Sequence, residues 1–463
     1  MKIVLISFVT PASENIRGTS ALPYHLIKGG SPSPSLPRRE GDNGLTPNPS
    51  PEREGNQDNG TQKSQNNEGN EFVIYTFNNN GLSDEKIAEV EKELKCAIKI
   101  VPLPGWYRWM FKMHLLFLRV FLKYPFSNYI TLPERYVREI CDANPDLIWV
   151  YQEELSRVER QFSGFRRIQI GPDTESLYYY RMMGRRFVMN NPIEYWKCAL
   201  MYRKYARMER DFCTDENFTY YAVGEEDVRH LKQINPKVKA KFLRHPHYEV
   251  SSKLKIENGK LKINFHQPKI KVLIAGQYNL YMKQEADELL EELKNSRIEE
   301  LKEHYVFTFL GKGWEKHVEN MRKVGYEVEH ITFAPDYIEE ISKHDIQITP
   351  IAIGTGTKGK VLDALANGLL VIGTPYAMEN IAVEHGKSCV VYREPEEVIG
   401  ILRSLTPNPS PEGEGNFEGE GDYKRNIEKY ERIAAEGQRM VLKWHDRAKI
   451  ANELFKGKVN SHT

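Results

Sequence analysis

Residues 345–374 read DIQITPIAIGTGTKGKVLDALANGLLVIGT, and this stretch predicts a strand, a glycine loop, a helix and a second strand. Gly354 and Gly356 let the loop backbone approach a ligand closely. The helix that follows directs its free N–H groups and positive dipole end at the loop, which favours an anion such as a diphosphate. Lys358 and Lys360 stand in the first helical turn, where a bound anion would compensate their charge; solvated surface lysines are the alternative.

Asp363 lies one turn further along the same helix and can accept hydrogen bonds from ribose hydroxyls. The run Lys360-Val-Leu-Asp-Ala-Leu-Ala-Asn-Gly368 resembles the Lys-x-x-(Glu/Asp)-Ala-x-Ala-x-Gly helix of the group 1, family-4-like glycosyltransferases. The family often pairs two acids eight positions apart, whereas this chain has Thr355 at the first position. The resemblance therefore implies the ribose contact for Asp363 and no donor-sugar contact from an acid at position 355.

The resemblance covers most of the chain and is most specific over residues 345–380. It implies the GT-B fold, an α/β architecture in which two Rossmann-like, doubly wound domains face each other across a cleft. The donor would bind in the second domain and the acceptor against the first. The implied donor-binding residues are Gly276, Gly311, Gly313, Phe333, Gly354, Thr355, Gly356, Thr357, Asp363 and Glu379, and the implied acceptor-side residues are Arg17, Gly18 and Thr19.

Apolar strands alternate with amphipathic helices in both halves of the chain. We predict an N-terminal domain over residues 1–245, a linker over 246–268, a donor domain over 269–440, and a C-terminal helix over 441–463 that packs back on the first domain. Residues 45–56 and 405–416 are nearly identical, LTPNPSPEREGN and LTPNPSPEGEGN. They lie in polar tracts at about 31–71 and 405–422, which we interpret as insertions in surface loops outside the folded core.

The predicted activity is transfer of a sugar from a nucleotide-diphosphate donor to a glycan or lipid-linked acceptor. Lys358 and Lys360 would stabilise the departing diphosphate as catalytic groups. Asp173 follows a predicted strand of the first half and would orient or deprotonate the acceptor, although an aspartate that caps a loop fits the pattern equally. No Asp-x-Asp motif occurs, so we expect no metal and no other cofactor. The resemblance implies retention of configuration, in cell-surface polysaccharide or lipopolysaccharide synthesis. A non-catalytic scaffold and a nucleotide-sugar epimerase are the alternatives.

Residues 105–124 read GWYRWMFKMHLLFLRVFLKY, which we interpret as one helix. Arg108, Lys112, Arg119 and Lys123 would gather within about 60° of one helix face, with aromatic and aliphatic side chains around the rest. Such a helix suits the interface of an anionic membrane, and a core helix with one solvated stripe is the alternative.

The formal charge of +1 comes from 65 basic and 64 acidic side chains and argues against a nucleic-acid partner. Residues 101–210 alone carry about +7. The five cysteines are scattered without a Cys-x-x-Cys pair, which favours a reducing compartment. No stretch offers the roughly 20 apolar residues that a membrane span needs, so we expect a cytoplasmic protein. If the basic helix binds lipid, the protein would be peripheral at the inner face of the membrane.

Overall fold

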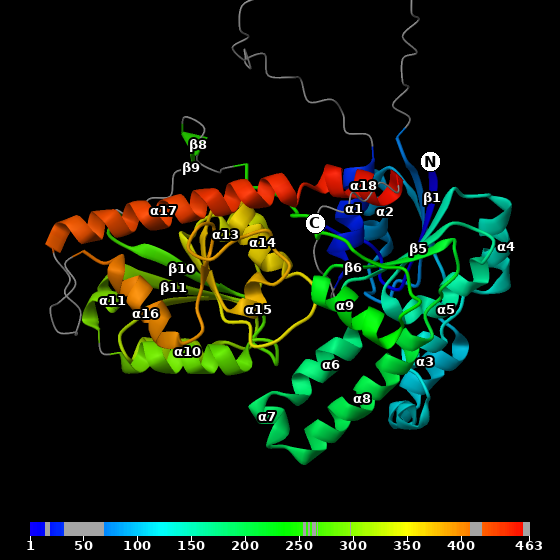
Figure 1. The fold of residues 1–463 in the computed structure, drawn as a ribbon, viewed down its shortest axis with the longest axis horizontal. Coiled ribbons are helices and arrows are strands. Elements are labelled where there is room, and N and C mark those ends of the chain that lie inside the picture. Colours follow the sequence, from blue (N-terminus) through cyan, green and yellow to red (C-terminus); the bar gives the residue numbers. More distant parts are fainter. Residues whose placement is uncertain are drawn as a thin grey trace, which may run out of the picture.

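The computed structural model describes residues 1–13, 19–31, 69–252, 256–257, 260–261, 265, 267–296, 298–407 and 419–456. Two parallel sheets, each covered by helices, form two domains that lie side by side (Figure 1). The expectation of two doubly wound domains is confirmed. Most of the two polar tracts falls outside the described residues.

The first sheet has seven strands in the order β3-β2-β1-β4-β5-β6-β7, all of them parallel. Most of its strands are short and largely buried, because helices cover both faces of the sheet. The strands are β1 (Lys2–Ser7), β2 (Glu71–Thr76), β3 (Ala97–Ile100), β4 (Leu147–Tyr151), β5 (Arg167–Gly171), β6 (Phe218–Ala222) and β7 (Ala240–Phe242).

The helices of the first domain include a long hairpin that projects from its lower edge in Figure 1, formed by α6, α7 and α8. Asn191 starts α8, because its side chain accepts hydrogen bonds from the N–H groups of Ile193 and Glu194 and is followed by a proline. The helical segments are α1 (Ala21–Gly30), α2 (Asp84–Leu94), α3 (Gly105–Lys112), η1 (Leu115–Phe121), η2 (Phe126–Tyr129), α4 (Glu134–Asp142), η3 (Glu153–Leu155), α5 (Ser156–Glu159), η4 (Arg160–Phe162), α6 (Glu175–Met183), α7 (Arg186–Met189), α8 (Pro192–Arg210) and α9 (Glu225–Ile234).

The second sheet has six parallel strands in the order β12-β11-β10-β13-β14-β15. A short antiparallel pair, β8 (Ile256–Glu257) and β9 (Lys260–Leu261), precedes it. The strands are β10 (Ile270–Ala275), β11 (Tyr305–Leu310), β12 (Glu327–Ile331), β13 (Ile346–Thr349), β14 (Leu370–Gly373) and β15 (Val390–Val391). The helices are α10 (Lys283–Asn295), α11 (Glu299–His304), α12 (Glu315–Lys323), α13 (Tyr337–Ile341), α14 (Gly359–Ala366), α15 (Pro375–Met378), α16 (Pro395–Ser404) and α17 (Gly419–Trp444).

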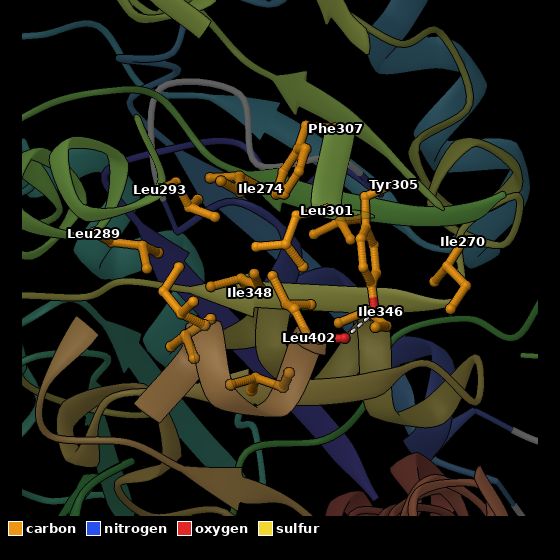
Figure 2. Packing of buried hydrophobic residues seen from close by; sticks show 14 of the residues in the cluster. Ile270, Ile274, Leu289, Leu293, Leu301, Tyr305, Phe307, Ile346, Ile348 and Leu402 are labelled. Carbon is orange, nitrogen blue, oxygen red and sulfur yellow. Dashed lines mark hydrogen bonds between the residues drawn. The ribbon is translucent and has the colours of Figure 1, made fainter. Parts of the chain in front are cut away.

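The core of the second domain lies between one face of this sheet and helices α10, α11 and α16 (Figure 2). Apolar side chains from both layers interleave there, and Tyr305 is buried among them. Its hydroxyl donates to the Leu402 carbonyl over 2.7 Å, so the one polar atom of this ring is satisfied. The sheet is thus held rigidly behind the loops at its carboxyl edge.

The C-terminal helices connect the two domains. Helix α17 runs along the second domain, and α18 (Arg447–Lys456) lies on the first domain beside α1 (Figure 1). Between them His445 is buried: its Nε2 accepts the Ala382 N–H over 3.1 Å, and its Nδ1 therefore donates to the His245 carbonyl over 2.6 Å. No helix in the described part of the chain is long and apolar enough to cross a bilayer.

The single helix expected over residues 105–124 is wrong. Helix α3 stops at Lys112, His114 adopts a left-handed conformation with φ of 53°, and η1 follows as a 3-10 segment. A left-handed residue ends an α-helix, so the basic residues at 108 and 112 no longer share a helix face with those at 119 and 123. All four basic side chains are nevertheless exposed.

Candidate functional site

The loop between β13 and α14 lies where the strand order of the second sheet reverses, because β10 pairs with β11 on one side and with β13 on the other. Doubly wound sheets bind ligands at the carboxyl ends of strands at such a point. Gly276 follows β10, and a Cβ on it would lie 3.5 Å from Nζ of Lys360. The structure therefore brings together the loop after β10 and the first turn of α14.

Three of the predicted donor-site glycines have backbone conformations that side chains disfavour. Gly276, Gly311 and Gly313 have φ values of 133°, 141° and 93°. A Cβ on Gly311 would also lie 2.3 Å from the Gly276 carbonyl oxygen. Glycine is required because the loops that follow β10 and β11 touch there.

The polar groups of the glycine loop contact the first domain. The Thr355 hydroxyl donates to Oδ1 of Asp173 over 3.1 Å, and the Gly356 N–H donates to Oδ2 of Asp227 over 3.1 Å. The Thr357 hydroxyl donates to a backbone carbonyl of the first domain over 2.5 Å. The predicted anion loop is thus also the point where the two domains meet.

Gly356 is needed for this contact. Its φ is +61°, and a Cβ on it would lie 2.4 Å from the Pro172 carbonyl oxygen and 2.9 Å from Oδ1 of Asp173. Asn380 fixes the same residue from the other side, because its side-chain amide donates to the Gly356 carbonyl over 2.8 Å. Any larger residue at 356 would push the domains apart.

Lys358 is the residue that precedes the first turn of α14, and its ammonium group turns back on the loop. Nζ donates to the carbonyls of Thr355 and Gly356 over 2.8 and 3.1 Å. Burial lowers the pKa of this ammonium, and the nearby carboxylates of Glu379, Asp173 and Asp227 oppose the shift. Lys358 therefore shapes the loop, while Lys360 extends outward beside Gly276.

Asp173 lies just after β5, opposite the glycine loop. Burial raises the pKa of its carboxyl to about 6, and the neighbouring Asp227 adds to the shift. A carboxyl with a pKa near neutrality can exchange a proton with a substrate hydroxyl. Asp173 therefore lies at the contact between the two domains, beside Thr355 of the glycine loop.

Asp363 lies on α14 with only 4% of its surface exposed. Its Oδ1 has no hydrogen-bond partner within the described structure. Burial raises the pKa of its carboxyl to about 8, against the opposing effects of the Tyr248 backbone and Lys360. An unpartnered buried oxygen is costly to the protein alone, and it is suited to accept a hydrogen bond from a ligand hydroxyl.

Glu379 forms a two-pronged ion pair with Arg181 of the first domain. Two guanidinium nitrogens donate to its two carboxylate oxygens over 2.7 and 2.9 Å, with 14% and 17% of the two side chains exposed. Arg181 also donates to the Gly354 carbonyl over 2.5 Å. Glu379 also lines a cavity of about 380 Å³ between the two domains, together with Asn380, Arg229, Arg244 and the acidic Glu225 and Glu226.

The remaining predicted residues lie around this centre or outside the described structure. Phe333 is 76% exposed in the segment between β12 and α13. The Thr19 carbonyl accepts a hydrogen bond from the Tyr151 hydroxyl over 2.7 Å in the first domain. Arg17 and Gly18 lie outside the described residues. Within the described ranges, no group of three His, Cys, Asp or Glu side chains is arranged to hold a metal ion.

Sequence reasoning missed Arg181 and Asn380, and it gave Asp227 no role at the site. Arg181 and Asp227 belong to helices α6 and α9 of the first domain, and only folding brings them to the loop. Asn380 directly follows Glu379, and its positive φ of 68° is the one local signal of a special backbone position.

Comparison with protein families identifies the second domain. Residues 269–407 match the family model described as glycosyl transferases group 1. No curated protein matches the chain by sequence.

Solved structures resemble the whole chain. HepE from Anabaena, in complex with UDP, has a TM-score of 0.56 at 11% identity, over 99% of each chain. Sucrose-phosphate synthase from Thermosynechococcus elongatus has a TM-score of 0.55 at 10% identity, over 98% of this chain and 97% of that one. A glycosyltransferase from Rickettsia africae has a TM-score of 0.54 at 9% identity, over 100% of both chains. At these identities the likeness shows the fold, which is the GT-B arrangement of two Rossmann-like domains.

Proposed function

We propose that the chain, whose residues 269–407 match the model of the group 1 glycosyl transferases and whose two domains have the GT-B fold, is a nucleotide-sugar-dependent enzyme. It transfers a sugar from a nucleoside-diphosphate donor to a glycan or lipid-linked acceptor. The donor binds at the carboxyl edge of the second sheet, and the acceptor approaches from the first domain. HepE, with the same fold, has been solved with UDP and with UDP-glucose.

The observation that carries this proposal is the arrangement at the start of α14. The helix N-terminus, Lys358 and Lys360 concentrate positive charge beside the glycines that follow β10 and β13. Asp363 adds a buried carboxyl oxygen without a partner in the described structure. Together these groups supply positive charge for a diphosphate and an acceptor for a ribose hydroxyl.

The chemistry follows from the same charges. Lys360 and the helix N-terminus stabilise the negative charge that develops on the departing diphosphate, and Lys358 keeps the loop in place for it. Asp173 orients the acceptor hydroxyl from the opposite domain. We propose retention of configuration, with a leaving phosphate oxygen assisting the incoming hydroxyl. We propose that no divalent ion takes part, because protein cations supply the compensating charge.

A membrane is the proposed setting, in cell-surface polysaccharide or lipopolysaccharide synthesis at the cytoplasmic face. The support is a set of exposed aromatic side chains on α3 and η1, namely Trp106, Trp109, Phe111, Phe117 and Phe121. Phe121 is 83% exposed, and the exposed basic residues 108, 112, 119 and 123 lie in the same segments. Aromatic rings with surrounding cations match an anionic lipid interface and would bring the acceptor site to a lipid-linked substrate.

Calorimetric titration with UDP, GDP, ADP and dTDP tests the donor assignment. We expect one of them to bind the wild-type protein, and we expect the double variant Lys358→Ala, Lys360→Ala to bind it at least about tenfold more weakly. Lys323→Ala removes an exposed lysine on α12 and is the matched control. Turnover of the corresponding nucleotide sugar should persist in EDTA. Unchanged affinity in the double variant would refute the assigned diphosphate site.

A further inference from the structure

Helix α6 and the residues just after its end reach across the domain interface through three side chains. Tyr178 stacks on Tyr281 of the second domain, with ring centroids 5.2 Å apart and planes at 26°. Arg185 pairs with Glu285 over 2.9 Å. Arg181 lies between them. Among the described contacts, it is the one basic side chain of the first domain that donates a hydrogen bond to the glycine loop.

Two observations separate Arg181 from an ordinary ion pair that joins two domains. Its guanidinium contacts the carbonyl of Gly354, the first glycine of the predicted diphosphate loop, in addition to Glu379. It also has spare hydrogen-bonding capacity, because an arginine has five N–H donors and the described contacts of Arg181 use three.

We propose that Arg181 of the first domain binds the diphosphate of the nucleotide sugar. It would thus complete a sugar-nucleotide site whose other residues belong to the second domain. This inference rests on the proposed function. The planar guanidinium fork suits phosphate oxygens better than a point charge does. Glu379 and the Gly354 carbonyl hold the guanidinium group at the loop, so it is already positioned to meet the nucleotide sugar.

The location of Arg181 on the first domain has a mechanistic consequence. The other groups assigned to the diphosphate, Lys358, Lys360 and the start of α14, all belong to the second domain. A phosphate contact from α6 is complete only when the domains are closed, as they are here. Donor affinity then depends on closure, and closure assembles the acceptor side, including Asp173, against the donor.

Calorimetry on the full chain tests the inference with the nucleoside diphosphate that binds the wild-type protein. We expect Arg181→Gln to weaken that binding about tenfold or more, and Arg181→Lys, which keeps the charge but loses the fork, to fall in between. Arg185→Gln is the matched control, because it breaks a neighbouring interdomain ion pair of similar exposure without touching the loop. Its affinity should stay within about twofold of the wild type.

The outcomes are distinguishable. If Arg181 only fastens the domains together, Arg181→Gln will bind the nucleotide as tightly as Arg185→Gln, or more tightly because a competing contact is gone, and either result overturns the inference. Thermal unfolding of each variant shows whether a loss of binding comes from misfolding. If Arg181→Gln is misfolded, the affinity of Arg181→Lys tests the inference instead, and an affinity equal to that of the wild type overturns it. If the wild-type protein itself binds no nucleoside diphosphate, the proposed function falls and the inference falls with it.

Discussion

At the scale of single residues, Asp363 shows how a group proposed to bind ligand can cost the folded protein stability. Its carboxyl is buried on α14, and one of its oxygens has no partner in the described structure. An ionised carboxylate in such a place is poorly solvated, which is why burial raises its pKa to about 8 from the ordinary value of 3.8. Binding groups that are unsatisfied without their ligand are a known source of the trade-off between stability and function.

The sign of the pH effect follows from proton binding. Between about pH 4 and pH 8 the folded protein holds a proton on Asp363 that the unfolded chain has released. This carboxyl therefore favours the folded state most at low pH, and its contribution is lost as the pH rises through about 8.

We predict that Asp363→Asn raises the melting temperature relative to the wild type at pH 8 and that the gain disappears towards pH 4 to 5. The same substitution should weaken binding of the nucleoside diphosphate, because an amide replaces the proposed acceptor of the ribose hydroxyl. Thermal unfolding at several pH values and calorimetry measure the two effects. A stability difference that does not change with pH would contradict the buried-carboxyl explanation.

At the scale of the element, residues 105–124 show where helical periodicity is an incomplete guide. The pattern of basic and apolar side chains continues through the segment, but the helix ends at Lys112 and the chain passes through a left-handed residue. Lys204 of α8 donates a hydrogen bond to the Arg119 carbonyl and so fixes η1 from a distant part of the sequence. A contact of that kind leaves no trace in the local pattern.

The aromatic side chains of α3 and η1 are exposed despite this change, and they support a prediction about membranes. We expect the wild-type protein to sediment with vesicles that contain phosphatidylglycerol. We expect Trp109→Ser with Phe121→Ser to lower that partitioning by about a hundredfold or more, since each ring contributes about 1.5–3 kcal/mol when its apolar surface leaves water and about 1.4 kcal/mol is a factor of ten. Leu442→Ser removes an exposed apolar side chain from α17 and should have no effect. Equal sedimentation of all three proteins would exclude membrane insertion of these aromatic side chains.

At the scale of the whole molecule, the last described helix belongs to the first domain. Phe455 of α18 is fully buried, with its ring 5.3 Å from that of Phe72 on β2 and 5.5 Å from that of Trp149 on β4. The chain therefore folds its first domain around a helix that lies more than 400 residues from its first strand. Completion of that core requires nearly the entire chain.

We predict that Phe455→Ala lowers the free energy of unfolding of the first domain by about 3–5 kcal/mol, because it leaves a cavity between α18 and the sheet. Lys449→Ala, on the exposed side of the same helix, should change stability by less than about 0.5 kcal/mol. Urea unfolding followed by limited proteolysis measures the loss and shows which domain opens first. Preferential opening of the second domain in Phe455→Ala would contradict this assignment.

Much of the architecture is readable from local sequence. Buried strands such as Tyr305–Leu310 are continuous apolar runs, and helix Asp84–Leu94 begins after a serine cap, so local sequence is enough to indicate both. Other elements give weaker signals. The strands Ala97–Ile100 and Ala240–Phe242 are hard to recognise in the sequence, since each is very short and lies at an edge of the first sheet.

The amino-acid sequence alone determined the two doubly wound domains and the glycine loop that leads into α14, because strand and helix periodicity and glycine conformation are properties of neighbouring residues. Only the tertiary structure decided what surrounds that loop: Asp173, Asp227 and Arg181 reach it from the first domain. These three residues are more than 120 positions away from the loop in the sequence. No local pattern encodes such contacts, because they form only when the two separately packed domains come together.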